Sequence, residues 1–492
     1  AHMATAWPEI VFSGEHDAAA LSRAVSRGTI RRLGRGIYSG DLTTELDELV
    51  RHHLFEIVGH EFPGAVFVDR SATTAGRPAD GAVFVDHPRQ RRVELPGVTI
   101  WPRHGPGALP GDMPMPEGLE LSSRARALLD NLVPSRANAR IRRTLAPVEV
   151  EDWIDRLVHE LGADGINALR DQARALAPEI RRTKEMERLD ALISVALTTR
   201  DDVTISSPTL AARGDGLPYD ARRLELFSAL TDTIANTSPH TLPALPEDVR
   251  RRTLLPFYEA YFSNFIEGTE FTIDEAAQIV FNREVPEDRP ADAHDITGTY
   301  EIVANQVEMR RVPRSFDELG ELLRVRHGVL MASRPDKRPG EYKNTPNRAG
   351  STEFVLPELV EGTLEQGFDL VGEITSPFFR ALYMMFLVAE VHPFTDGNGR
   401  IARIMMSAEL QHAGEVPIII PTVYRNNYLA ALRAATYNTS FDPLMAMLMF
   451  AQRYTARVDF TDRTTAESDL DRTNAFRDAN EAEASGVRLV LP

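Results

Sequence analysis

The N-terminal third of the chain alternates between short helical and strand-like patterns. Residues 18–26 have the Ala/Leu spacing of a helix, and residues 29–38 alternate like a strand, a turn and a second strand. This order, a helix followed by a small β-wing, is typical of a winged helix-turn-helix. The hexapeptide Gly-Ala-Val-Phe-Val-Asp occurs at 64–69 and again at 81–86, which predicts two buried strands. Further on we expect a strand at 98–101, a proline-rich loop at 102–116 and a helix at 122–130.

Helical spacing dominates the rest of the chain, apart from one interruption. Apolar residues recur every three to four positions over 148–195 and over 377–391, and the second stretch is apolar on nearly every face, as in a helix buried at a domain centre. Residues 206–216 contain Pro208 and two glycines, which predicts a linker and a main boundary near residue 210. The predicted parts are a cloning remnant and tail at 1–8, a winged helix-turn-helix-like region at 9–58, an α+β region at 59–205, a mostly α-helical domain at 215–459, and an acidic tail at 460–492 that is helical at best and loosely held.

Composition narrows the class of protein. The 492 residues are 43% hydrophobic and 26% charged, with no apolar run of bilayer-spanning length, so we expect neither a membrane-spanning nor a wholly disordered chain. The absence of cysteine excludes disulfides, thiolate metal sites and cysteine nucleophiles. No signal peptide is recognisable at the start, so the cytoplasm is the expected location. Arginine greatly outnumbers lysine, a habit typical of a GC-rich bacterial genome.

A short basic segment stands out against the net charge of −17. After Asp17 no acidic residue occurs until Asp41, and five arginines lie between them. Such a run is a candidate DNA-binding surface, because Lys and Arg neutralise phosphates; the alternative is an arginine-rich face that water alone covers. The five residues are Arg23, Arg27, Arg31, Arg32 and Arg35.

Several short motifs of this region resemble the AbiEi-type antitoxin and transcriptional-regulator family. They are Leu33-x-Arg35-Gly36-Ile37-Tyr38, the two strands around Ser71-Ala72, a strand beginning Pro96-Gly97-Val98, and a helix with Ser-x-x-x-Ala-Leu-Leu-Asp from Ser123. The resemblance covers about residues 9–135 and implies a regulator that binds operator DNA, as in a toxin–antitoxin module.

The segment from His392 to Arg403 concentrates the chemistry of the chain. Its sequence, His-Pro-Phe-Thr-Asp-Gly-Asn-Gly-Arg-Ile-Ala-Arg, lies between two predicted helices. Gly397 and Gly399 permit positive φ and close approach, so backbone N–H groups at the start of the second helix can form an anion cradle. Phe394 is expected to point away from the cradle and anchor the loop in the core.

Polar side chains of the same segment complete a site for phosphoryl-type transfer. Asn398 can donate its amide to a phosphate oxygen, and Arg400 and Arg403 project from the first helical turn as two guanidinium groups that lack an anionic partner. Asp396 is a hard oxygen ligand of the kind that Mg²⁺ prefers, and His392 can accept a proton near neutral pH.

This segment resembles the signature of the Fic-domain family at every specified position. The resemblance implies AMPylation, the transfer of AMP from ATP to a hydroxyl side chain of a protein, with His392 as base and Asp396 as the Mg²⁺ ligand. It also implies that the phosphates are bound by Gly397, Asn398, Gly399, Arg400 and Arg403. A lysine replaces Gly399 in the phosphorylating branch of the superfamily, so adenylyl transfer is favoured here over kinase activity.

A second element lies upstream, in Ser263-Asn264-Phe265-Ile266-Glu267-Gly268 after a helical, aromatic stretch. It resembles the inhibitory helix that class II Fic proteins carry N-terminal to the catalytic core. By this resemblance, Glu267 pairs with Arg403 and removes the guanidinium that holds the γ-phosphate, and Ser263 belongs to the same motif. The alternative is a surface glutamate.

Two further segments resemble parts of the Fic domain. Residues 340–343 and 351–357 bracket a Pro/Asn/Gly turn and predict an exposed hairpin, similar to the Fic flap that receives the target segment by strand addition. Its candidate residues are Thr352, Glu353, Phe354 and Val355. Arg425-Asn426-Asn427-Tyr428-Leu429 resembles the element near the adenine pocket but departs from it at Leu429, so the base contacts stay open. The remaining histidines that we weighed as metal ligands, including His294 and His327, lack ligand spacing and are expected to be solvated or packed.

The sequence therefore predicts a multidomain chain with a mostly α-helical Fic fold and a β-hairpin flap, preceded by an α+β region containing a winged helix-turn-helix. The expected activity is protein adenylyl transfer, autoinhibited by Glu267 and open to self-modification. The alternative is a DNA-binding regulator or antitoxin whose Fic half senses nucleotide or removes AMP. The expected partners are ATP with Mg²⁺, a target protein, operator DNA and a second copy of the chain, with no membrane.

Overall fold

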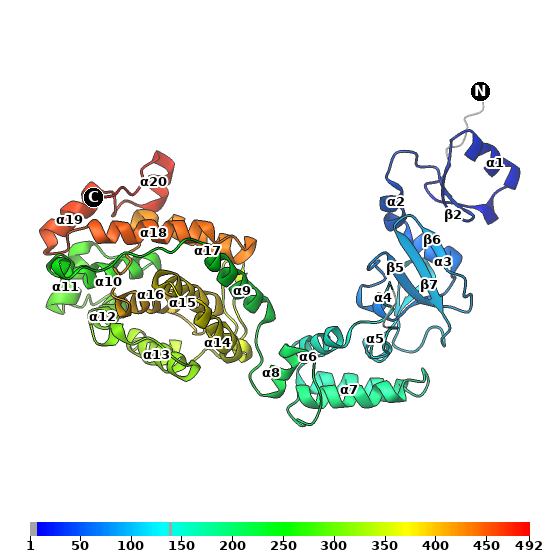
Figure 1. The fold of residues 1–492 in the computed structure, drawn as a ribbon, viewed down its shortest axis with the longest axis horizontal. Coiled ribbons are helices and arrows are strands. Elements are labelled where there is room, and N and C mark those ends of the chain that lie inside the picture. The colour runs from blue at the N-terminus through cyan, green and yellow to red at the C-terminus, as the bar shows by residue number, and fades with distance from the viewer. Residues whose placement is uncertain (1–6, 137–139) are drawn as a thin grey trace. The chain divides into compact units, whose positions relative to one another are not determined.

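The computed structural model describes residues 7–136 and 140–492, so most of the remnant and tail predicted at 1–8 lies outside the described residues. The chain divides into two compact units, Ala1–Gly216 and Leu217–Pro492 (Figure 1). Within the part of the chain that is described, none of the helices combines the length and the apolar character needed to cross a bilayer.

The N-terminal unit begins with a small antiparallel sheet packed on one helix. Its strand order is β1-β3-β2, and α1 buries Leu21 and Ala24 in a small core with Ile30. Asp17 caps α1 by accepting a hydrogen bond from the backbone N–H of Ala20. The helix and the strand pair predicted from the sequence are confirmed, whereas their assignment to a winged helix-turn-helix stays a prediction. The bounds are β1 Val11–Phe12, α1 Ala18–Ser26, β2 Arg31–Gly34 and β3 Ile37–Ser39.

A mixed six-stranded sheet follows, in the order β6-β7-β5-β4-β9-β8. The two copies of the hexapeptide pair antiparallel as β4 and β5, and both are buried, as predicted. β5 and β7 run parallel, and α2 and α3 supply buried side chains to the core of this sheet. The bounds are α2 Leu46–His52, α3 Leu54–Glu61, β4 Val66–Phe67, α4 Arg70–Thr73, β5 Ala82–Asp86, β6 Val93–Leu95, β7 Val98–Arg103, β8 Met113–Pro114 and β9 Glu120–Leu121.

Four helices complete the N-terminal unit: α5 (Arg124–Asn131), α6 (Pro147–Leu176), α7 (Thr183–Ala196) and α8 (Pro208–Gly214). The linker predicted at 206–216 is wrong in one respect, because most of it is α8. Pro208 occupies the first turn of that helix, where no N–H is needed, and Ser207 accepts a hydrogen bond from the backbone N–H of Leu210. Leu210 is fully buried against α6 and α7.

The C-terminal unit is almost entirely helical around one central pair. α15 and α16 pack side by side at its centre (Figure 1), and α15 is buried along nearly its whole length, as its apolar sequence predicts. The helices are α9 Ala221–Ala235, α10 Leu255–Ile266, α11 Ile273–Asn282, α12 Pro290–Val303, α13 Phe316–Leu330, α14 Val360–Asp369, α15 Pro377–Val391, α16 Asn398–His412, α17 Arg425–Asn438, α18 Asp442–Arg457, α19 Arg463–Arg472 and α20 Ala479–Ser485.

The acidic segment at 460–492 is not loosely held, so that prediction is wrong. Leu470 and Ala475 are fully buried, and the ring of Phe476 stacks on Phe262 of α10 with centroids 5.7 Å apart. Buried alanines of α19 and α20 allow this close packing. Most of the acidic residues are exposed, whereas Glu467 and Asp469 are partly buried in ion pairs with Arg463 and Arg472. The segment therefore belongs to the same core as α10.

Candidate active site

The glycine-rich loop connects the two central helices. α15 ends at Val391, and His392 caps it in the left-handed conformation at φ 53°. Phe394 is fully buried in the main core, which confirms its predicted anchoring role. Gly397 then takes φ 79°, a conformation that favours glycine, and α16 begins at the next residue. The loop therefore presents the N-terminus of α16 beside His392.

The hydrogen bonds of His392 leave one ring nitrogen available as a base. Nδ1 lies 3.1 Å from the carbonyl oxygen of Ala389. Because a carbonyl only accepts, the neutral ring carries its hydrogen on Nδ1 and its lone pair on Nε2. Burial, aided by the nearby Lys343 ammonium, lowers the pKa of His392 to about 4. The imidazole is therefore neutral at physiological pH.

Two side chains brace the loop from within, and the first corrects a prediction. Asn398, expected to donate its amide to phosphate, instead donates it to the carbonyl of Phe394 and accepts from the N–H of Phe394, each at 2.8 Å. The side chain thus closes the turn, because a buried amide satisfies its donor and acceptor locally. This leaves the backbone N–H of Asn398 as its group for an anion.

His327 is a bracing residue that sequence reasoning missed. Its ring stacks on Phe394 with centroids 3.8 Å apart. Nδ1 accepts the N–H of Gly340 at 3.0 Å, so Nε2 carries the hydrogen and donates to the carbonyl of Asp396 at 3.0 Å. Burial lowers the pKa of His327 to about 4, which keeps this neutral form. Only the pairing of segments far apart in the chain reveals the role.

The N-terminus of α16 already faces a carboxylate. A Cβ atom at Gly399 would lie 2.1 Å from Oε1 of Glu267, so any larger residue would displace the glutamate. Gly399 lies inside the helix and, unlike Gly397, needs no positive φ; its use is close approach. Glu267 therefore lies where the first-turn N–H groups and the helix dipole favour an anion.

Arg403 joins Glu267 and Ser263 in one contact, of which only the pairing with Glu267 was expected from the resemblance to the inhibitory helix. Nη2 of Arg403 donates to Oε1 of Glu267 at 2.6 Å and to the carbonyl of Ser263 at 2.9 Å, and Nε donates to Oγ of Ser263 at 2.9 Å. Burial raises the pKa of Glu267, but the charge and hydrogen bond of Arg403, together with the charges of Arg400 and His392, lower it more, so the net pKa lies below its ordinary value. The pair is therefore ionised at neutral pH.

Arg400 differs from its prediction. It is 3% exposed, and Nη1 lies 3.0 Å from Oδ2 of Asp295 and 3.3 Å from Oδ1 of Asn264. The expectation that both loop arginines lack an anionic partner is wrong, because a buried guanidinium requires one. Asp295, on α12, also binds Arg334 at 2.8 Å and is a further residue that sequence reasoning missed.

Asp396 is the one carboxylate of the loop that faces solvent. Its side chain is 48% exposed, and Oδ1 accepts the N–H of Gly397 at 2.7 Å. Among residues 7–136 and 140–492, no cluster of three or more His, Asp or Glu side chains is arranged to hold a metal. A single oxygen donor fits Mg²⁺ only where water and substrate phosphates complete the shell.

The flap is shorter than predicted. Residues 340–343 form no strand, and the hairpin pairs only β10 (Arg348–Ala349) with β11 (Thr352–Glu353). Val355 is 1% exposed and belongs to the core rather than to the flap edge. Thr352 hydrogen-bonds Tyr437, and the carbonyl of Glu353 accepts from Arg223 at 2.7 Å. The segment 340–343 is held by contacts to the loop instead.

Phe354 and Lys343 connect the flap region to His392. The ring of Phe354 stacks on that of His392, with centroids 3.6 Å apart and planes 3° apart. Lys343 is 4% exposed and donates Nζ to Oδ1 of Asn347 at 2.8 Å, while its backbone N–H donates to the carbonyl of Pro393 at 2.9 Å. Burial lowers the pKa of Lys343 to about 7. The role of Lys343 was not foreseen, because Gly-Glu-Tyr-Lys was assigned to a strand.

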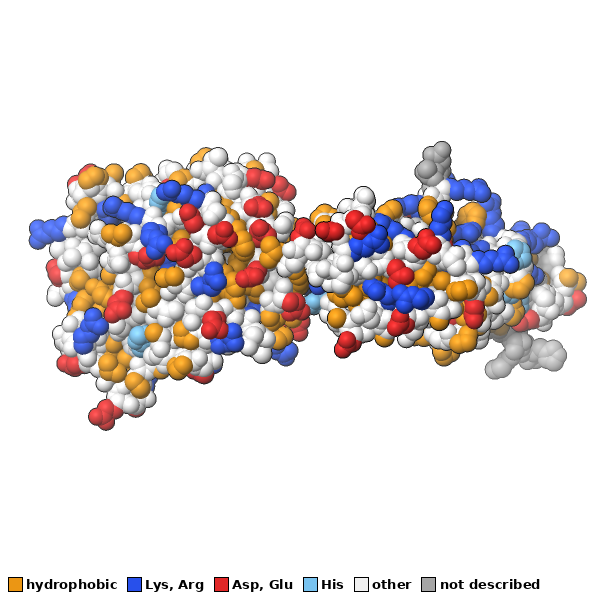
Figure 2. Space-filling view, turned by 90° about the horizontal axis from the view of Figure 1, so that it is seen from below, with side chains coloured by type: hydrophobic (Ala, Val, Ile, Leu, Met, Phe, Trp, Pro, Cys, Tyr) orange, Lys and Arg blue, Asp and Glu red, His pale blue; other side chains and the backbone are white. Residues whose placement is uncertain are grey.

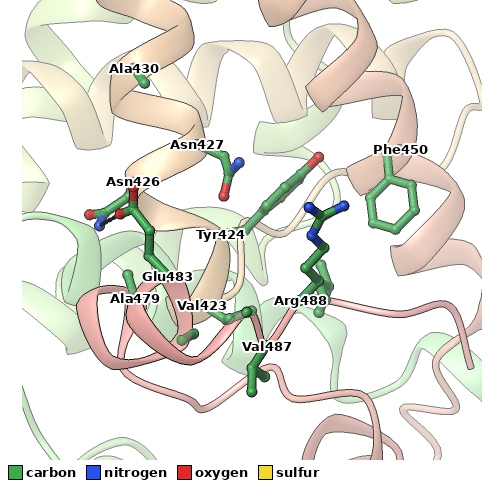
Figure 3. Close-up of a pocket in the computed structure, with 13 residues that line it drawn as sticks. Val423, Tyr424, Asn426, Asn427, Ala430, Phe450, Ala479, Glu483, Val487 and Arg488 are labelled. Carbon is green, nitrogen blue, oxygen red and sulfur yellow. Dashed lines mark hydrogen bonds between the residues drawn. The ribbon is translucent and has the colours of Figure 1, made fainter.

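The element at 425–429 splits between two environments. Tyr428 is 1% exposed, and its ring centroid lies 5.7 Å from the guanidinium carbon of Arg403. Asn426 and Asn427 instead line a separate cavity of about 620 Å³ (Figure 3), where Nδ2 of Asn426 donates to Glu483 of α20 at 3.1 Å. His392, Asp396 and the loop glycines do not line that cavity. The adenine contacts stay open.

In the N-terminal unit, the five predicted DNA-binding arginines do not behave alike. Arg31 donates to the backbone carbonyls of Asp41 and Thr44, at 2.8 and 2.6 Å, and so holds a turn. The other four are exposed: Arg23, Arg27, Arg32 and Arg35.

Comparison with known proteins agrees with the chemistry of the loop. Residues 318–410 match the model of the Fic/DOC family. The chain is 26% identical over 264 residues to "Protein adenylyltransferase Fic" of Nematostella vectensis, covering 51% of this chain and 59% of that protein. It is 31% identical over 128 residues to "Protein adenylyltransferase fic-1" of Caenorhabditis briggsae, covering 25% and 24%. The chain thus spans less than two thirds of the length of these curated relatives.

Solved structures of Fic proteins are also similar to the chain. Fic-1 (aa134 - 508) from C. elegans is 20% identical, with a TM-score of 0.36, covering 62% of this chain and 95% of that one. A Fic domain containing signaling protein from Bacteroides thetaiotaomicron is 19% identical, with a TM-score of 0.36, covering 46% and 91%. The family match at 318–410 includes the histidine and both glycines of the loop. Residues 318–410 of this chain are therefore a Fic domain.

Proposed function

We propose that the C-terminal unit transfers AMP from ATP to a hydroxyl group of a protein and that Glu267 holds this activity low. The observation that carries the proposal is the 2.6 Å ion pair between Glu267 and Arg403, formed beside the first turn of α16 and next to His392. An anion-binding helix terminus, a neutral imidazole and a carboxylate in the anion position together fit an autoinhibited nucleotidyltransferase.

The transfer step uses Nε2 of His392 as general base. Nε2 takes the proton of the target hydroxyl while the hydroxyl oxygen forms a bond to the α-phosphorus of ATP. The bond between the α-phosphorus and the bridging oxygen to the β-phosphorus breaks, and pyrophosphate leaves. The Nδ1–H bond to Ala389, at 3.1 Å, holds the ring in the tautomer that this step needs. The first-turn N–H groups of α16 bind the departing phosphates.

Asp396 is the residue that would hold Mg²⁺. Its exposed carboxylate fits a cation whose remaining ligands are water and phosphate oxygens. When bound, the metal would neutralise negative charge that develops on the phosphates. His327 and Asn398 keep the Asp396 backbone and the loop in register through the hydrogen bonds described above.

In this proposal, the carboxylate of Glu267 inhibits transfer by occupying the position that the γ-phosphate of ATP needs. Oε1 of Glu267 lies over Gly399 and holds Arg403, so a γ-phosphate meets a carboxylate where it needs N–H groups and a guanidinium. Phe354 covers one face of His392 as well. Removal of the carboxylate would free the anion site, leave His392 in place and lower its pKa further.

Labelled ATP and Mg²⁺ test the proposal with the wild type, Glu267→Gly and Glu267→Gly/His392→Ala. We expect labelled protein, either the chain itself or a protein of an added lysate, with Glu267→Gly only. Equal labelling without His392 would reject the base, and no labelling with Glu267→Gly would reject the transfer. Glu267→Asp serves as a matched control, since it keeps the charge on a shorter side chain.

A second function, DNA binding by the N-terminal unit, is favoured by the four exposed arginines at 23–35. We propose that they contact phosphates of operator DNA, with or without a second copy of the chain. The double variant Arg23→Ala/Arg27→Ala should weaken binding to DNA from the chain's own promoter region and reduce its salt dependence. Arg31→Ala is a poor test, because Arg31 supports the turn at 41–44. Binding that ignores both salt and these arginines would contradict the proposal.

A further inference from the structure

A large cavity in the N-terminal unit is lined by none of the residues of the candidate active site. Its volume is about 950 Å³, and its lining comes from β5, β7 and residues within 133–136 and 140–144, together with Asp80 and Arg92. Drug-sized ligands occupy cavities of about 300–1,000 Å³, so this one can hold far more than a single phosphate ion. The lining side chains that matter here are Phe84, Arg92, Trp101, Arg136, Arg140 and Arg143.

The guanidinium groups of this cavity are poorly neutralised, because Asp80, a carboxylate that also lines it, pairs with Arg70 at 2.6 Å. Arg136 and Arg140 are exposed and form no salt bridge within the described residues. Arg143, 46% exposed, approaches Asp69 only to 3.7 Å. Arg92 pairs with Glu94 at 2.7 Å, but both side chains are more than half exposed, and such a pair contributes little. The four arginines are therefore available to an anion.

Charge along the chain points the same way. Residues 87–144 contain ten arginines and five acidic residues, a local net charge of +5 in a chain of −17. Figure 2 shows Lys and Arg side chains gathered over the N-terminal unit on the face that it displays. Arg103 and Arg126 of this range are buried in ion pairs with aspartates, so the surface charge comes from its other arginines, including those that line the cavity. A basic surface of this kind attracts anionic ligands.

Aromatic rings provide the second half of the cavity's chemistry. Trp101 is half-buried on β7, and Phe84 is 4% exposed on β5. The guanidinium carbon of Arg92 lies 5.2 Å from the centroid of Trp101, and that of Arg143 lies 6.0 Å from the centroid of Phe84. Flat rings next to guanidinium planes favour stacking of a nucleobase, whereas an acidic peptide would use only the charges.

We propose that this cavity binds a nucleotide unit of single-stranded nucleic acid, with its base against Trp101 and its phosphates on Arg136, Arg140 and Arg143. The site is separate from the ATP site of the Fic domain and from the arginines at 23–35. The same chemistry recognises a free nucleotide, so the test includes both sources.

The experiment titrates the full chain with a fluorescent single-stranded oligonucleotide of about twelve nucleotides, within the range that single-strand sites cover. Binding by the wild type should show a salt dependence corresponding to about two released ions for three phosphates. We expect Arg136→Glu/Arg140→Glu to weaken binding by about tenfold or more. The matched control, Arg77→Glu/Arg156→Glu, changes the same charge at two exposed arginines that do not line this cavity and should shift affinity by less than about twofold.

Tryptophan fluorescence locates the ligand. The chain has three tryptophans, and base stacking should quench Trp101, so the Trp101→Phe variant should lose the quenching while it keeps most of the affinity. Quenching by free AMP or UMP at the same nucleotide concentration would also support the site and would identify a free nucleotide as its source. Equal loss of affinity in both double variants, equal affinity for a poly-glutamate peptide, or no binding at low salt would each overturn the proposal.

Discussion

Both units bury an arginine against carboxylates, but the two arrangements differ in what can reach them. In the N-terminal unit, Arg126 binds Asp86 and Asp112, each at 2.7 Å, and all three side chains are at most 2% exposed. In the C-terminal unit, Arg403 binds the single carboxylate of Glu267, whose side chain is 35% exposed. Glu267 caps the end of α10, whereas Asp86 is the last residue of β5, an inner strand of the six-stranded sheet.

An ion pair whose partners are both fully buried has a structural role. An ion pair with one partly exposed partner is a candidate switch. Arg126 cannot leave its aspartates without leaving a buried guanidinium and two buried carboxylates unpaired. Glu267 is partly exposed at a helix end, and our proposal requires that it turn toward water when an anion takes its place. The predictions below separate these two roles.

The largest expected effect comes from the loss of the buried ion pair between Arg126 and Asp86. Asp86→Ala leaves the Arg126 guanidinium short of a buried partner and should lower the free energy of unfolding of the N-terminal unit by about 3–5 kcal/mol. Urea unfolding measures it, with Asp86→Asn as the isosteric control, which should lose less. In the Glu267→Gly background the same change should leave AMP transfer within about twofold. A large loss of transfer in a folded Asp86→Ala chain would contradict the division of roles.

Glu267→Gly should raise the rate of AMP transfer and lower stability less than Asp86→Ala does. Couplings of this kind are worth about 1–3 kcal/mol, so we expect an increase of about 5- to 150-fold in initial rate. The loss in the free energy of unfolding should stay below that of Asp86→Ala, because Glu267 is 35% exposed and the guanidinium of Arg403, only 8% exposed, keeps its hydrogen bonds to Ser263. A drop in stability as large as that of Asp86→Ala, without activation, would show that Glu267 has a structural role like that of Asp86.

The rate of AMP transfer by the Glu267→Gly chain should not show the fall below about pH 6.5 that the protonation of an ordinary histidine base causes. His392 has a pKa of about 4, so it stays a neutral base down to about pH 5. The rate with Glu267→Gly should therefore fall by less than about twofold between pH 7.5 and 5.5, where a histidine at its ordinary pKa would give about tenfold. An acid limb near 6.5 would contradict the buried geometry.

The lowered pKa values of His392 and His327 should also make the stability of the C-terminal unit depend on pH. Between pH 6.5 and 4, His392 and His327 bind protons in the unfolded chain but not in the folded one. The C-terminal unit should therefore lose stability as the pH falls through this window. The lowered pKa of Glu267 keeps its pair with Arg403 ionised until the pH falls below the ordinary pKa of a glutamate. The stability that this pair contributes is therefore lost as the pH falls, whereas an ordinary histidine pair loses its contribution as the pH rises.

The smallest expected effect concerns Lys343. Three charged groups act on His392: Lys343 lowers its pKa, and Glu267 and Asp396 raise it. In the Glu267→Gly background, Lys343→Met should move the acid limb upward by about half a pH unit, while Lys343→Arg keeps the charge and should restore the limb. NMR titration of the His392 ring gives the same answer without any transfer activity. An unchanged titration would leave Lys343 with a packing role only.

The features predictable from the sequence are those that local chemistry determines. The loop and its two helices follow from a glycine that takes positive φ and from apolar spacing in 377–391. Contact between Glu267 and Arg403 was expected only through resemblance, because the two residues lie 136 positions apart. Asp295, His327 and Lys343 carry no local signal for their contacts with the loop, so only the fold reveals them.

The errors have physical causes as well. Pro208 was taken as a linker signal, but a proline is equally at home in the first turn of a helix, and α8 begins with it. The segment 460–492 was judged by its many acidic residues, so the alanines and Leu470 that pack it on α10 were overlooked. Asn398 was assigned to a ligand because its burial in the turn could not be read from spacing.

The most direct test of the central claim compares ATP labelled on the α-phosphorus with ATP labelled on the γ-phosphorus. Each is incubated with the Glu267→Gly chain, Mg²⁺ and lysate, with Glu267→Gly/His392→Ala alongside. The account predicts that protein retains the α-label, does not retain the γ-label, and loses all labelling without His392. Retention of the γ-label, or the same α-labelling in both variants, would contradict AMP transfer by this loop.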